Sequence, residues 1–100
     1  MTNDNKTQDD SKLILSSVRA LWGLVTPHLR SVSVEMRDNT IFWQCIFDKD
    51  ATEGDLEFMS EASSEVIADF KSNKINENIQ IIPFPENTRH LKNLIYLRNE

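Results

Sequence analysis

Hydrophobic residues recur at helical spacing in two segments of the chain. The first runs from Ser11, a candidate N-cap, to the Thr-Pro pair at residues 26–27. The second begins after Thr52, which resembles a capping box together with Asp55, and runs to about Lys71. We therefore predict two amphipathic helices, each packed on a sheet through one face. The inward faces are expected to hold Leu13, Ile14, Val18, Leu21, Trp22 and Val25 in the first helix, and Leu56, Met59, Ser63, Val66, Ile67 and Phe70 in the second.

Between the two predicted helices, hydrophobic and polar residues alternate as they do in strands. The Asp38-Asn39 pair in the middle of this segment is typical of a tight hairpin turn. After the second helix, the segments IQIIPF from residue 79 and LKNLIYLR from residue 91 predict two more strands. Pro83 lacks the N–H group that an inner strand needs, so the strand near Ile79 to Ile82 is expected at a sheet edge. The inward side of the first hairpin is expected to carry Val32, Val34, Met36, Ile41, Trp43, Cys45 and Phe47.

The predicted order of elements is α-β-β-α-β-β. It indicates an α+β fold in one domain, with a four-stranded, mainly antiparallel sheet and both helices packed on one face. The order of the strands within the sheet is left open. Residues 1–10 contain no apolar residue after Met1 and are expected to form a disordered leader, so the domain is expected to span residues 11–100.

Acidic residues outnumber basic residues by 16 to 11, and they are unevenly placed. Residues 48–70 hold eight acids and only one base, Lys49. Phosphate would be repelled by such a stretch, so we expect a cationic protein partner and no direct contact with nucleic acid. A single cysteine, and the lack of a signal peptide pattern or of an apolar run of spanning length, favour a cytoplasmic location with no membrane partner.

The residues that commonly carry chemistry are few and scattered. His28 and His90 lie in different connections, and Cys45 lies within an alternating apolar strand, which favours a core thiol over a reactive one. These three residues lack the spacing of a metal site, and residues 48–55, DKDATEGD, lack the sixth-position glycine and twelfth-position acid of a calcium loop. We therefore predict that the protein is not an enzyme and uses no metal or other cofactor. A cleft that joins a histidine to a carboxylate would argue against this prediction.

Acidic residues occupy every fourth position of the second predicted helix. Like charges at this spacing repel by roughly 0.2–0.5 kcal/mol per pair, and a surface selected only for stability would alternate them with lysine. Phe58 falls on the same outward side of the helix, where it could act as an interface anchor. The alternatives are a merely solvated face and a Phe58 that a loop or the leader covers. The residues predicted to bind a partner are Glu53, Glu57, Phe58, Glu61, Glu65 and Asp69.

Three stretches of the chain together resemble a known protein family. They are ALWGLVTPHLRSVSVE at residues 20–35, SEVIADF at 64–70 and YLRNE at 96–100. In this order they resemble small bacterial immunity proteins, some of which look like immunity proteins for contact-dependent growth inhibition toxins. Residues 85–93, PENTRHLKN, depart from the proline- and glycine-rich connection of the relatives.

The resemblance implies a protein that binds and neutralises a cognate toxin. Such toxins are often nucleases with basic active sites, which an acidic immunity protein would occlude. The carboxylates that face the toxin would then be those of the second helix, with Phe58 as an anchor. The alternative interpretation is a non-catalytic homo-oligomeric or adaptor protein that uses the exposed sheet edge near Ile79 to Ile82.

Overall fold

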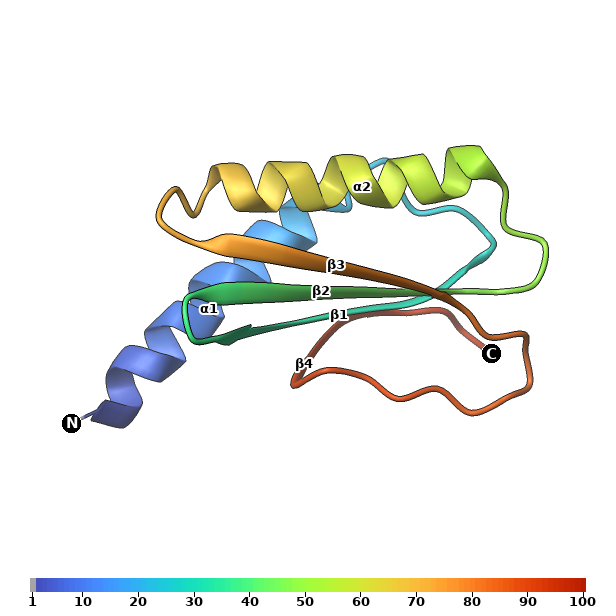
Figure 1. The fold of residues 1–100 in the computed structure, drawn as a ribbon. Helices are drawn as coiled ribbons and strands as arrows, with labels where there is room; N and C mark the ends of the chain where they lie inside the picture. Colours follow the sequence, from blue (N-terminus) through green and yellow to red (C-terminus); the bar gives the residue numbers. More distant parts are fainter. Residues whose placement is uncertain (1) are drawn as a thin grey trace.

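The computed structural model describes the backbone of residues 2–100 and the side chains from Asp10 onwards. The predicted order, α-β-β-α-β-β, is confirmed, and α2 lies along the sheet (Figure 1). The elements are α1 (Thr2–Ala20), β1 (Leu29–Arg37), β2 (Thr40–Phe47), α2 (Glu53–Ala68), β3 (Lys74–Ile81) and β4 (Asn93–Leu97).

The four strands form one mixed sheet in the order β3-β2-β1-β4. β1 pairs antiparallel with both β2 and β4, whereas β2 pairs parallel with β3. The parallel pair arises because α2 carries the chain back to the end of the sheet where β2 began. The sheet is therefore mainly antiparallel, as predicted, and its edges are β3 and β4.

Both helices pack on one face of the sheet. α1 contacts β1 and β4, α2 contacts β2 and β3, and the helices contact each other. The alternation predicted for the first hairpin is confirmed by its register, because Val32 lies opposite Cys45 and Val34 opposite Trp43. The buried core between the layers consists of Leu13, Ala20, Leu21, Leu29, Val32, Val34, Ile41, Trp43, Cys45, Phe47, Met59, Ala62 and Val66.

The other face of the sheet is covered in part by the connection between β3 and β4 (Figure 1). Polar side chains of the inner strands bind the backbone of this connection: Ser33 Oγ accepts from the Leu91 N–H at 2.9 Å, and Gln44 Nε2 donates to the Arg89 carbonyl at 2.6 Å. These bonds explain how Ser33 and Gln44 can be buried. The segment PENTRHLKN therefore has a structural role beneath the sheet.

The first helix differs from its prediction at both ends. It begins at Thr2, so Ser11 lies within the helix and is not its N-cap. The division into a leader of residues 1–10 and a domain of residues 11–100 stays a prediction. Trp22 was expected in the core, but it is 73% exposed. The helix ends at Ala20, Leu21 takes the buried position, and Gly23, at a φ of 78°, turns the chain away.

The inward face of α1 is also narrower and more polar than predicted. Ile14, Val18 and Val25 are exposed, although the spacing places them on the apolar side. Ser17 and Ala20 are buried instead, and their small side chains let the helix approach the layer beneath it closely. The prediction for α1 was wrong for these residues because its apolar positions span more of the helix than the sheet covers.

No helix in the part of the chain that the structure describes is long and apolar enough to cross a membrane.

Candidate partner-binding surface

The start of α2 is fixed by the predicted capping box. The Asp55 N–H donates to Thr52 Oγ1 at 3.2 Å, and the Thr52 N–H donates to Asp55 Oδ2 at 2.9 Å. The hydrogen bond from the Thr52 N–H lowers the pKa of Asp55 the most, and the contact with His28 lowers it further. Two backbone donors at the helix N-terminus are thereby satisfied, although Asp is shorter than the usual Glu at this position.

His28 does contact a carboxylate, because its Nδ1 lies 2.9 Å from Asp55 Oδ2. Neither residue lines any of the four main hollows of the described chain, so this contact belongs to the helix cap and forms no cleft. His90 Nε2 lies 3.3 Å from the Thr88 hydroxyl. Cys45 is fully buried, and burial raises the pKa of its thiol. Among the described residues, no three His, Cys, Asp or Glu side chains form a group that could hold a metal ion.

The inner face of α2 is held on the sheet by apolar contacts and by one carboxylate. Met59, Ala62 and Val66 are buried in the core. Glu77 of β3 accepts hydrogen bonds from Ser60 Oγ and Ser63 Oγ, the first at 2.8 Å. These contacts fix the rotation of the helix about its axis. The opposite face of the helix must therefore point to solvent.

The predicted acids occupy this outward face. All five are exposed, and none forms an ion pair with a described residue. Over 16 residues they extend about 24 Å along the helix. We call Glu53, Glu57, Glu61, Glu65 and Asp69 the acidic ridge.

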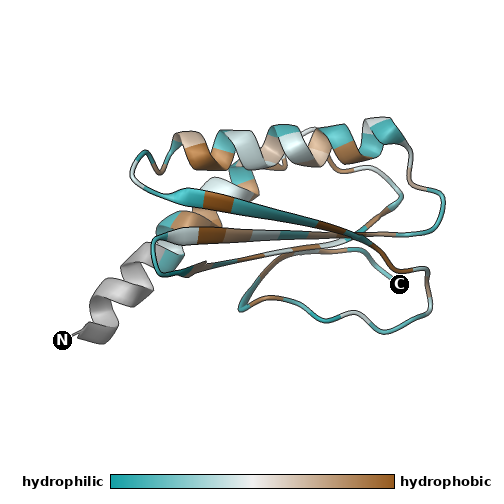
Figure 2. Cartoon of the chain, in the orientation of Figure 1, coloured by the Kyte–Doolittle hydropathy of each residue, from teal (hydrophilic) through white to brown (hydrophobic). Residues whose placement is uncertain are grey.

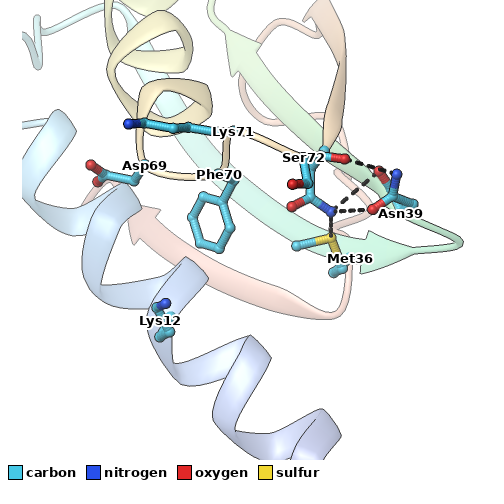
Figure 3. Close-up of a pocket in the computed structure, with 8 residues that line it drawn as sticks. Lys12, Met36, Asn39, Asp69, Phe70, Lys71 and Ser72 are labelled. Carbon is cyan, nitrogen blue, oxygen red and sulfur yellow. Dashed lines mark hydrogen bonds between the residues drawn. The ribbon is translucent and has the colours of Figure 1, made fainter.

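Asp69, the last member of the acidic ridge, differs from the other four. It is the C-cap of α2, and its Oδ2 accepts a hydrogen bond from Ser16 Oγ of α1 at 2.7 Å. A hollow of about 420 Å³ lies beside it, and Phe70 points into this hollow from the end of α2 (Figure 3). Lys12 and Lys71 also line the hollow, so its charge is mixed. The four glutamates therefore form the part of the ridge that no neighbouring side chain holds in place.

Phe58 lies outside the core and is 40% exposed. On a helical wheel it lies about 20° from Asp69, on the flank of α2 that turns toward α1. A large apolar side chain thus lies beside the ridge and is partly open to solvent. Its role as an interface anchor stays a prediction.

Two arginines and two carboxylates form an ionic cluster that sequence reasoning missed. Arg30 donates to Glu100 through Nε at 2.7 Å and Nη2 at 3.0 Å, and Arg98 Nη2 lies 2.8 Å from Asp48 and 2.9 Å from Glu100. Arg98 lowers the pKa of Asp48, and Arg30 lowers the pKa of Glu100. The cluster fastens the C-terminus to β1. Three of its residues lie in stretches that carry the family resemblance: Arg30 in ALWGLVTPHLRSVSVE, and Arg98 and Glu100 in YLRNE.

The cluster also shows which acids of the acidic stretch, residues 48–70, are neutralised by ion pairs. Asp48 is paired with Arg98, and Asp55 with the helix cap and His28. Glu35 and Asp10, outside the stretch, are paired with Arg37 and Lys92. The ion pairs of the described residues thus involve acids other than those of the ridge. The five ridge acids on α2 thus form a group of exposed negative charges without an ion pair to a described residue.

The sequence model of the family described as MafI2 immunity protein matches residues 10–100. No curated protein matches the chain in sequence. The resemblance to small bacterial immunity proteins is confirmed, and the family is of the Maf type rather than specifically that of contact-dependent growth inhibition. Since the match covers almost the whole chain, the protein belongs to the MafI2 immunity protein family.

Proposed function

We propose that this protein neutralises its cognate toxin by covering a basic active site with the acidic ridge, and that this toxin is a nuclease. Membership of an immunity protein family implies a toxin as the partner. One observation carries the choice of surface: the ridge acids are exposed and form no ion pair with a described residue, while the acids outside the ridge hold the ion pairs of this part of the chain. A nuclease fits because an enzyme that holds phosphate needs a cationic site.

The arrangement of charges has a cost that binding would remove. The acidic ridge contains four pairs of acids at i and i+4, which together destabilise α2 by roughly 1–2 kcal/mol. Arginine or lysine side chains of a partner would turn this repulsion into attraction. The repulsion that destabilises the free protein would therefore be relieved in the complex, and this relief would add to the affinity.

The mechanism is occlusion, with no reaction catalysed by the immunity protein. The field of the ridge accelerates the approach of a cationic toxin, and close contacts then hold the complex. Phe58 would supply buried apolar contact beside the charges, since a few aromatic anchors usually carry much of the binding energy. The ridge is about 24 Å long, which suits an interface of standard size, about 800 Å² on each partner.

The test uses the purified cognate toxin domain and measures association by stopped flow at several salt concentrations. The double variant Glu61→Gln/Glu65→Gln should lower the association rate constant roughly tenfold at low salt. The control Asp38→Asn/Glu86→Gln removes the same charge from exposed positions off the helix and should change the rate much less. The triple variant Glu57→Lys/Glu61→Lys/Glu65→Lys should lose both binding and protection of cells. Retention of wild-type binding by this triple variant would exclude the ridge as the toxin-binding surface.

A further inference from the structure

An apolar flank of α1 is open to solvent. Ile14, Leu15 and Val18 lie within about 100° of each other on the helix, and all three are exposed. Trp22 continues this flank in the turn that follows and is 73% exposed. A tryptophan of roughly 250 Å² thus presents roughly 180 Å² to water. Such a side chain usually marks a surface that another molecule covers.

The apolar flank continues onto β4. Val18, Trp22 and Val25 line a hollow of about 420 Å³ together with Ile95 and Tyr96 of the strand. Leu94 and Leu97 of β4 are opposite Ser33 and Ser31 and lie on the other face of the sheet, where they are also largely exposed, at 45% and 57%. We call the edge of β4 and its surroundings the β4 surface. It consists of Ile14, Val18, Trp22, Val25, Ile95 and Tyr96 on the helix side of the sheet, and of Leu94 and Leu97 on the other side.

The two edges of the sheet are protected very differently. β3, KINENIQI, carries Lys74, Glu77 and two asparagines, and is coloured as hydrophilic along most of its length (Figure 2). β4, NLIYL, carries no charge and four apolar residues. Edge strands have unpaired N–H and C=O groups, and soluble proteins usually guard them with charge or proline. The β4 edge lacks both devices, so a strand from another molecule can pair with it.

We propose that the β4 surface binds a second copy of this chain through antiparallel pairing of β4 with its counterpart. A twofold axis perpendicular to the sheet would give an eight-stranded sheet in the order 3-2-1-4-4′-1′-2′-3′. Both pairs of helices lie on the same face of that sheet. The open flank of α1 then meets the same flank of the other copy, and Trp22 becomes buried between them.

The charge distribution selects a second copy over the cationic toxin. The β4 surface has no ionisable group other than the phenol of Tyr96, so it offers nothing to a basic partner. Lys92 and Arg98, which flank β4, are each paired with a carboxylate of their own chain, which reduces their repulsion in a self-paired strand. The acidic ridge lies on α2, which packs over the opposite edge strand, β3. Two copies joined at β4 therefore keep their ridges apart and open. The choice of a second copy over the toxin rests on the cationic toxin of the proposed function, whereas the pairing at β4 does not.

The experiment is sedimentation velocity of the full chain at micromolar concentrations. We expect a species of about 23 kDa, twice the chain mass of 11.6 kDa. Leu97→Lys would place a lysine in the paired strand of each copy, beside apolar side chains of the other copy, and should raise the dimer Kd by at least about tenfold. The matched control is Ile81→Lys, which introduces the same charge at a residue 53% exposed at the end of β3, and should leave the Kd unchanged.

Trp22→Ser provides a second test outside the strand, with Phe58→Ser as its control. Both positions are exposed and neither belongs to the core, so circular dichroism should show a folded chain in each case. Trp22→Ser should weaken the dimer, and Phe58→Ser should not. A wild-type chain that sediments as a monomer of 11.6 kDa would overturn the proposal, as would a dimer that Ile81→Lys breaks and Leu97→Lys does not.

Discussion

Replacing the central acid of the ridge by lysine should make the protein more stable. Glu61 has like-charged neighbours four residues away on both sides, Glu57 and Glu65, and forms no ion pair with a described residue. Each repulsive pair costs roughly 0.2–0.5 kcal/mol, and each attractive pair gains a similar amount. Glu61→Lys converts two pairs and should raise the free energy of unfolding by about 1–2 kcal/mol.

Other effects of this substitution on the helix are small. Glu and Lys have similar helix propensities, and residue 61 lies in the middle of α2, beyond the reach of the charges at the helix ends. In a domain of this size, 1 kcal/mol corresponds to about 4–8 °C in Tm, so a rise of about 4–16 °C is expected. Glu61→Gln should give about half of this rise, because it removes repulsion without adding attraction.

The assay is thermal unfolding followed by circular dichroism at low and high salt. The gain should shrink strongly in 1 M NaCl, where the Debye length is about 3 Å. Glu86→Lys, an equal change of charge in the exposed β3–β4 connection, should give no comparable rise. If Glu61→Lys failed to stabilise the chain, or if the gain persisted at high salt, the ridge would not be a set of mutually repelling charges.

Two further predictions concern the ionic cluster and the helix cap. Asp48, Asp55 and Glu100 have lowered pKa values, so their stabilisation is complete above their ordinary pKa values of 3.8, 3.8 and 4.5 and is lost as the pH falls below them. Urea unfolding should therefore show stability falling below about pH 4.5, less steeply in Glu100→Gln, and equal profiles for both proteins would contradict the assignment. Thr52→Ala should cost about 1 kcal/mol in urea unfolding, because the Asp55 N–H loses its acceptor. Thr88→Ala, away from any helix end, is its control, and an equal loss there would argue against a specific cap.

The parts of the fold that local spacing determines could be predicted from the sequence. Alternation placed Val34 and Trp43 on the inner side of the first hairpin, and the helical period placed Met59 and Val66 inside and Glu61 outside. In each case the element is amphipathic and has one buried face. The spacing of hydrophobic residues along such an element therefore predicts which side chains are buried in the core.

The missed features depend on contacts between distant parts of the chain. Arg30 and Glu100 are 70 residues apart in sequence, and neither shows a local pattern that indicates a pair. Trp22 was assigned to the core because its spacing fits α1, but its burial depends on where the helix ends and on how far β4 extends beneath it. The strand order likewise depends on the connection that carries β4 to the far edge.

The residues that hold α2 in place are different from the residues that α2 exposes to solvent. Met59, Val66 and the bonds to Glu77 fix the inner face, and the capping box fixes the start. Four of the ridge acids, Glu53 to Glu65, take part in none of these contacts. Substitutions at these four positions change charge and repulsion without removing a core contact, so under the proposed function this face can be altered to suit a particular toxin at little risk to the fold. We therefore expect toxin specificity to be altered most readily on the outer face of α2.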